Sequence, residues 1–142
     1  PARLGILGFS AGAHLAVPTS TNFDRRAYEA MDAIDKESCR PDFAVALYPG
    51  HLWIDYQKFE LNPNIPVTRN TPPTFLVQAE DDPVDNVNNS LVYYKALTRA
   101  GVAVEMHLYP VGGHAFGLRR TENPITEWPE LAEKWLQTIG II

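Results

Sequence analysis

The sequence predicts an α/β fold, a parallel sheet of about four strands flanked by helices. Three features of the 142 residues lead to this prediction. Short, nearly unbroken apolar runs of strand length recur along the chain. Amphipathic helical segments alternate with these runs, and glycine or proline residues lie at many of the boundaries between a run and a helical segment. Strands that are apolar on both faces are typical of parallel sheets covered by helices, and such sheets are built with right-handed crossovers.

Four strands are expected, over residues 3–7, 42–48, 74–79 and 102–109. The first three are almost wholly apolar, which indicates burial on both faces. The fourth differs, because Val104, Met106 and Leu108 alternate with Glu105, His107 and Tyr109. Such alternation is typical of a strand nearer the sheet edge.

Helices are expected after Ser10, over 24–37, over 86–100 and from about 126 to 139. Pro18 should end the first within about two turns. The third and fourth carry apolar stripes at helical spacing, and a glycine follows each. The stripe residues are Val87, Leu91, Tyr94 and Leu97 in the third helix, and Leu131, Trp135, Leu136 and Ile139 in the fourth.

The stretch from 51 to 73 is the least regular part of the chain. It contains four prolines, with apolar and aromatic residues between 52 and 59. Long loops of this kind often form lids or binding walls. A surface excursion that only covers the core explains the composition equally well, so both interpretations stay open.

Composition excludes several classes of function. The net charge is −5 and no basic cluster is present, which argues against a nucleic-acid partner. No apolar run approaches the ~20 residues of a membrane span. The single cysteine, Cys39, excludes an internal disulfide without fixing the compartment, and localisation stays unknown. Neither metal-ligand spacing nor a phosphate loop is found, so no metal and no cofactor are expected.

The stretch Gly8-Phe9-Ser10-Ala11-Gly12 has the pattern of a nucleophile elbow, a tight strand-to-helix turn with a serine at its tip. At either glycine a side chain should collide with neighbouring backbone. Ser10 should adopt a strained conformation that holds its hydroxyl out of the sheet. The backbone N–H of Ala11, in the first turn of the following helix, should point at an oxyanion.

Two further polar features follow predicted strands, Asp81 after the third and His114 after the fourth. Parallel strands end at one edge of a sheet, so Ser10, Asp81 and His114 should meet there as nucleophile, acid and base. Taken singly, each has an ordinary explanation as a turn or loop residue, but the order Ser–Asp–His favours a triad. Asp82 is the alternative acid. The weaker alternatives for the base are His14, His51 and His107.

Several motifs resemble those of esterase/lipase-type α/β-hydrolases, in particular acetyl-xylan esterases and related carbohydrate esterases. They are the elbow with its continuation 13–16, the segments 39–43, 75–84 and 87–91, Gly112-Gly113-His114 with 115–118, and Trp128-Pro129 ahead of Trp135-Leu136. The resemblance implies Ser10 as nucleophile, His114 as base and Asp81 as acid, because the family acid is commonly the first Asp of an Asp-Asp-x-Val run. Gln78 stands where many relatives carry histidine, and Ala13 replaces a frequent glycine.

Relatives carry about four more strands before the elbow, together with a loop that gives the second oxyanion N–H. The chain is therefore interpreted as the C-terminal half of an α/β-hydrolase domain (residues 1–142), without the N-terminal strands and the oxyanion loop. If the chain is complete, its first strand is an exposed sheet edge, and we expect it to pair with a second copy as a homodimer.

The resemblance implies a serine hydrolase that cleaves short acyl esters, acetyl esters among them, through an acyl-enzyme. Its substrate would be a small-molecule or carbohydrate ester. Two alternatives remain: a serine peptidase of the prolyl-oligopeptidase type, which shares these motifs, and a non-catalytic hydrolase-fold module used for binding.

Overall fold

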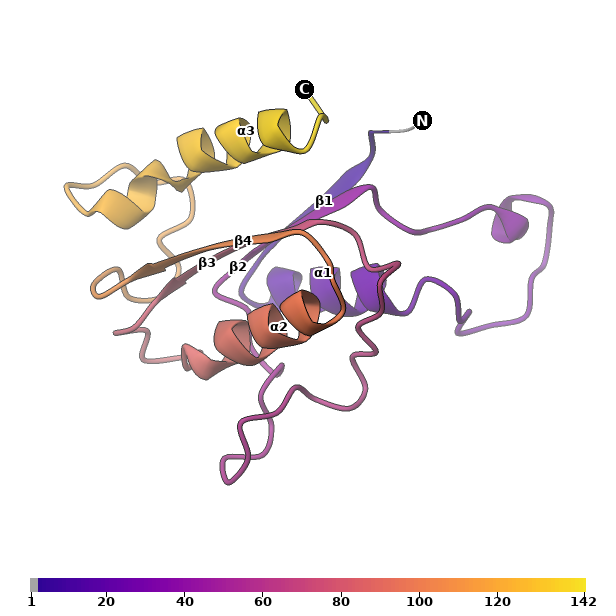
Figure 1. Ribbon diagram of the computed structural model, residues 1–142, viewed down its shortest axis with the longest axis horizontal. Helices are drawn as coiled ribbons and strands as arrows, with labels where there is room; N and C mark the ends of the chain where they lie inside the picture. Colours follow the sequence, from indigo (N-terminus) through magenta and orange to yellow (C-terminus); the bar gives the residue numbers. More distant parts are fainter. Residues whose placement is uncertain (1–2) are drawn as a thin grey trace.

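The computed structural model describes residues 3–142 and contains a four-stranded parallel sheet in the order β1-β2-β3-β4 (Figure 1). The strands are β1 (Gly5–Phe9), β2 (Phe43–Leu47), β3 (Thr74–Ala79) and β4 (Val104–Tyr109). The predicted fold class is confirmed, and β3 has the expected bounds. The register pairs Phe9 with Leu47, and Ala79 with Tyr109, so the carboxyl ends of all four strands lie at one edge of the sheet.

Helices cover both faces of the sheet (Figure 1). Helices α1 (Ala11–Thr21) and α2 (Asn88–Arg99) lie on one face, and α3 (Trp128–Thr138) lies on the other. The two faces have separate hydrophobic cores, one built around Phe75, Val77 and Trp135 and the other around Leu76, Tyr93 and Leu97. Because successive strand residues point to opposite faces, the apolar residues of β3 supply both cores.

Pro18 does not end α1, which continues to Thr21. The expectation of a shorter helix was wrong because a proline near a helix end removes only one intrahelical bond. The Pro18 carbonyl still accepts the backbone N–H of Asn22 at 2.8 Å. The Ser20 hydroxyl, which donates to the Ala16 carbonyl, adds a further contact within the last turn.

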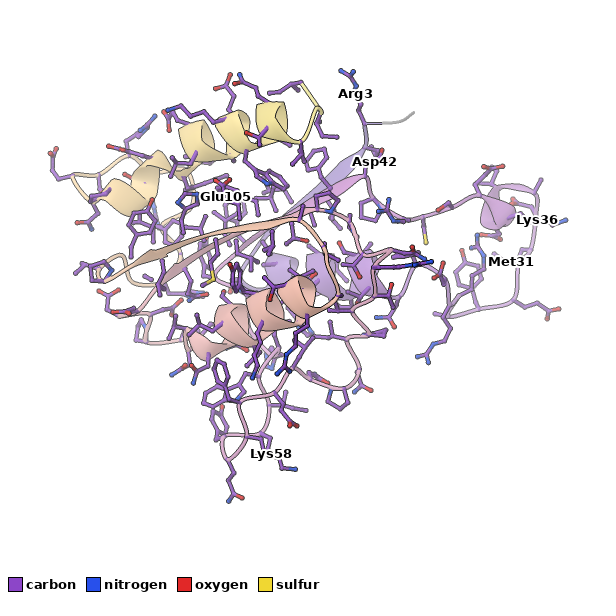
Figure 2. All side chains as sticks on the ribbon, in the orientation of Figure 1. Arg3, Met31, Lys36, Asp42, Lys58 and Glu105 are labelled. Atoms are coloured by element: carbon purple, nitrogen blue, oxygen red, sulfur yellow. The ribbon has the colours of Figure 1, made fainter. Side chains whose placement is uncertain are left out.

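The segment 24–37 is not the expected helix. It holds only the 3-10 turn η1 (Ile34–Lys36) within a lobe that projects from the sheet and carries Met31 and Lys36 (Figure 2). Asp32 accepts the backbone N–H of Ile34, and Asp35 accepts that of Met31, so carboxylates replace the helical carbonyl acceptors. The apolar residues taken as a helix face are exposed, with Met31 at 85%.

The buried face of α2 differs from the predicted one. Of the predicted stripe, only Leu97 is fully buried within the helix, whereas Asn89, Ser90, Val92 and Tyr93 lie inside. Two polar residues occupy the buried face because each has partners there. Asn89 accepts the backbone N–H groups of Leu52 and Trp53, and the Ser90 hydroxyl donates to Gln78. Hydrophobic spacing alone could not show this rotation of the helix.

Strands β1 and β4 form the two edges of the sheet in the described residues, as the alternating pattern of β4 predicted. The loop after β2 extends past α2 on the side away from the sheet, to a tip near Lys58 (Figure 2). Leu52 and Ile65 anchor it in the core of that face. Between residues 3 and 142, no helix is long and apolar enough to cross a membrane.

Candidate active site

Three side chains from the ends of three strands form one hydrogen-bonded row. Ser10 Oγ lies 2.9 Å from His114 Nε2, and His114 Nδ1 lies 2.8 Å from Asp82 Oδ2. Because an ionised carboxylate can only accept, Nδ1 carries the proton and Nε2 is free to accept from the serine hydroxyl. The row brings together residues 104 and 32 positions apart in the chain. This is the arrangement in which a serine can be deprotonated by an oriented imidazole.

The elbow holds Ser10 in a strained backbone conformation, as the motif predicted. Its φ is 51° and its ψ is −118°, and its backbone N–H donates to the Leu47 carbonyl at 3.0 Å. Gly8 is required, because a Cβ there would lie 2.2 Å from the Gly12 carbonyl oxygen. The same expectation for Gly12 is not met: a Cβ at Gly12 meets no described atom within 4 Å. The strain is thus fixed by the strand β2 contact and by the close approach at Gly8.

Ala11 is the first residue of α1 and lies directly after Ser10. Among the described residues, no acceptor is recorded for its backbone N–H. A free N–H in the first helical turn beside the serine is the kind of donor that an oxyanion needs.

The partner of the imidazole is Asp82, and the expectation of Asp81 was wrong. The Asp82 side chain is fully buried, and its Oδ1 accepts the backbone N–H groups of Val84 at 2.8 Å and Asp85 at 3.0 Å. Asp81 instead points to the loop that carries His114, where Oδ1 accepts the N–H groups of Gly112 and Gly113. Asp82 is therefore hydrogen-bonded to the His114 ring, whereas Asp81 is hydrogen-bonded to the backbone of the loop that carries His114.

Gln78 is a site residue that the sequence reasoning noted only as a departure from relatives. It is fully buried in β3, and its Nε2 donates to Asp82 Oδ2 at 3.1 Å and to the Asp85 carbonyl at 3.0 Å. Its Oε1 accepts the Ser90 hydroxyl at 2.9 Å, which fixes the amide orientation. A buried polar residue in an otherwise apolar strand was the available signal.

Tyr48 also belongs to the site and was not predicted. It follows β2 with a φ of 40°, and its ring packs edge-on against His114 with centroids 4.8 Å apart. Burial raises the pKa of the Tyr48 phenol, which therefore stays neutral near pH 7. The Tyr48 ring in turn packs edge-on against Phe116, with centroids 4.5 Å apart.

The alternative bases do not reach the serine. His14 Nδ1 bonds the Gly50 carbonyl at 3.1 Å, and its ring packs on His51 with centroids 5.2 Å apart. His107 pairs with Glu105 at 2.8 Å. In residues 3–142, no three histidine, cysteine or acidic side chains gather in a way that could hold a metal ion.

A cavity of about 280 Å³ opens beside the hydrogen-bonded row. Its lining residues are His51, Trp53, Ile54, Tyr56, Val84, Asp85, Asn86 and Asn89. Asp85 connects it to the row, because its Oδ2 lies 3.9 Å from His114 Nε2. A larger cavity, of about 540 Å³, lies between the loop after β2 and α2, but neither Ser10, His114 nor Asp82 lines it. None of these three residues lines the cavity of about 280 Å³ either, and Asp85 is its link to the row. A cavity of about 370 Å³ is lined by His114 itself, together with Phe116, Arg119 and Arg120.

Comparison with known proteins places this site in a family. The chain is 30% identical over 162 residues to an acetylxylan esterase of Xylanibacter ruminicola, which covers 99% of this chain and 30% of the relative. It is 37% identical, with a TM-score of 0.86, to the acetyl ester-xyloside bifunctional hydrolase of Caldicellulosiruptor lactoaceticus, over 100% of this chain and 58% of the other. An α/β hydrolase from a Medee basin deep-sea metagenome library matches at 26% identity and a TM-score of 0.69, over 95% and 53% of the two chains.

The chain thus spans under a third of the length of that curated relative and less than two thirds of these two solved chains. The resemblance to acetyl-xylan esterase-type α/β-hydrolases is confirmed, and so is the predicted fold class. The family model described as the prolyl oligopeptidase family matches residues 1–139. The chain therefore belongs to the prolyl oligopeptidase family and has the α/β-hydrolase fold.

Proposed function

We propose that the protein is a serine hydrolase of short acyl esters that works through Ser10, His114 and Asp82. The observation that carries the proposal is the continuous row of contacts, 2.9 Å from Ser10 Oγ to His114 Nε2 and 2.8 Å from His114 Nδ1 to Asp82 Oδ2. A serine with positive φ at the tip of a strand-to-helix turn adds independent support.

The chemistry follows from these positions. Ser10 Oγ attacks the acyl carbon while its proton passes to His114 Nε2, and Asp82 stabilises the resulting imidazolium. The oxyanion receives the backbone N–H of Ala11. The imidazolium then gives its proton to the departing alcohol oxygen, which leaves an acyl-Ser10 ester. Water, deprotonated by the same imidazole, attacks this ester and releases the carboxylic acid and free Ser10.

Acetyl esters on carbohydrates are the substrate class that the comparisons favour. One relative is named an acetylxylan esterase, and another is named an acetyl ester-xyloside bifunctional hydrolase. The family also gives its name to oligopeptidases, but one curated relative is named as an acetylxylan esterase and one solved relative as an acetyl ester-xyloside bifunctional hydrolase. We therefore propose ester hydrolysis rather than peptide hydrolysis or binding without turnover.

The proposal is tested by comparing an ester with an amide on the full-length protein. We expect p-nitrophenyl acetate to be hydrolysed with saturation kinetics, and an acyl-proline p-nitroanilide to be hydrolysed far more slowly. A higher kcat/KM for the proline amide would show that the protein is a peptidase. No turnover of either substrate would leave the site without the proposed activity.

Gln78 is expected to act as a positioning residue for Asp82. Replacing Gln78 with leucine removes the amide that donates to Asp82 Oδ2, and kcat should fall roughly 10–100-fold with little change in KM. Replacing Ser90 with alanine keeps that amide and removes only the bond that orients it, so a smaller loss is expected. Steady-state kinetics on p-nitrophenyl acetate, with melting curves alongside, check both. A change in KM without a change in kcat would contradict this role.

A further inference from the structure

Asp85 places a second carboxylate at the catalytic imidazole. It lies in the turn between β3 and α2, and its Oδ2 is 3.9 Å from His114 Nε2, the nitrogen that faces Ser10. The imidazole thus has Asp82 at one ring nitrogen and Asp85 near the other. Asp85 also lines the cavity of about 280 Å³ beside the row. It is therefore positioned to meet whatever part of an ester enters that cavity.

The backbone around Asp85 fixes the position of its carboxylate. The Asp85 N–H donates to Asp82 Oδ1 at 3.0 Å, and the Asp85 carbonyl accepts Gln78 Nε2 at 3.0 Å. Its Oδ1 occupies space left free by Gly50, where a Cβ would lie only 2.2 Å away. The side chain is 17% exposed. The negative charge is consequently held at one place in the wall of the site rather than moving freely in solvent.

No lysine or arginine lies within salt-bridge distance of this carboxylate in the described part of the chain, and Arg119 and Arg120 line a different cavity, one that His114 also lines. His114 is the only group there within salt-bridge distance of the Asp85 carboxylate, and it is neutral when Nε2 accepts from Ser10. The other residues that line the cavity are apolar, aromatic, amide or histidine side chains. A fixed carboxylate in a partly desolvated pocket acts on nearby charges more strongly than one in water.

We propose that Asp85 is a specificity-determining residue that excludes esters carrying a negative charge close to the scissile bond. Esters of neutral alcohols and neutral sugars then enter, whereas those with a neighbouring carboxylate, such as esters next to a uronic acid group, are disfavoured. The inference rests on the proposed function, and it adds the charge of the substrate to the reaction class.

The test uses two acetyl esters that differ only in charge, 4-acetoxybenzoate and the neutral 4-acetoxybenzamide, with the full-length protein. The measured quantity is the ratio of kcat/KM for the anion to kcat/KM for the amide. Replacing Asp85 with asparagine keeps the size of the side chain and should raise this ratio about tenfold. The control is Glu80→Gln, which changes the net charge equally at an exposed position outside the cavity lining, and should leave the ratio within about twofold.

The possible outcomes separate a failure of the inference about Asp85 from a failure of the proposed function. An unchanged ratio in Asp85→Asn, with the amide still hydrolysed, would overturn the inference and leave the proposed function intact. If the wild-type protein hydrolyses neither ester, the proposed function fails and the inference with it. If Asp85→Asn does not fold, the same ratio of kcat/KM values is measured for Asp85→Ala. Alanine is smaller than asparagine and cannot crowd Gly50. In the wild type the ratio should also rise at high salt, and a salt-independent ratio would count against a role for charge.

Discussion

Replacing Ser10 with alanine is expected to lower kcat for p-nitrophenyl acetate by about 10⁵-fold or more. The reason is that, in the described residues, Ser10 supplies the one hydroxyl that is hydrogen-bonded to His114 Nε2. The substitution removes one oxygen and leaves Gly8 and the backbone contact from residue 10 to Leu47 in place, so folding should be retained. Stopped assays over long times, with a buffer blank, measure the residual rate.

Ser20→Ala is the matched control for this experiment. Ser20 lies in α1, and its hydroxyl bonds the Ala16 carbonyl without contacting the site. Turnover should stay within about threefold of the wild type, since only a local hydrogen bond is lost. Equal rates for Ser10→Ala and the wild type would remove the serine from the mechanism.

Replacing Asp82 with asparagine should lower kcat about 10⁴-fold, whereas replacing Asp81 should cost less than about tenfold. An asparagine at position 82 no longer requires the proton of His114 to be on Nδ1, so Nε2 loses its place as the base towards Ser10. An asparagine at position 81 keeps an oxygen that can accept from Gly112 and Gly113, and the loop that carries His114 stays in place. Steady-state kinetics on both variants, with circular dichroism to confirm folding, give the comparison.

The two substitutions are the controls for each other, because they remove the same charge from adjacent residues. A larger loss for Asp81→Asn than for Asp82→Asn would contradict the assignment of the acid. Similar large losses for both would mean that the loop tether matters as much as the acid.

The sequence predicted the sheet because each strand is determined by a short run of neighbouring apolar residues. A run such as 74–79, flanked by proline and acidic residues, can hardly be anything but a buried strand, and β3 has those bounds. It also predicted that Ser10 and His114 would meet, since parallel strands end at one edge. The face of α2 that becomes buried, by contrast, is determined by contacts with distant parts of the chain. The helix turns Asn89 and Ser90 inward because the loop after β2 and Gln78 supply their partners.

The carboxylate that contacts the imidazole was mispredicted for a related reason. Asp81 and Asp82 are adjacent and chemically identical, so only their surroundings distinguish them. The turn that Pro83 begins lets Asp82 accept two backbone N–H groups, from Val84 and Asp85, and this turns its other oxygen towards the imidazole. Such an Asx-type turn can be predicted from the sequence. Whether it brings Asp82 to His114 depends on where the loop after β4 lies, which the sequence does not show.

The proposed mechanism requires Ser10 to be an activated nucleophile, and covalent labelling measures this directly. The full-length protein is treated with a reactive organophosphonate, digested, and examined by mass spectrometry. We predict one stoichiometric adduct, on the peptide that contains Ser10, and its loss in His114→Ala. An adduct on another residue, or none under conditions that label a known serine hydrolase, would contradict the proposed mechanism.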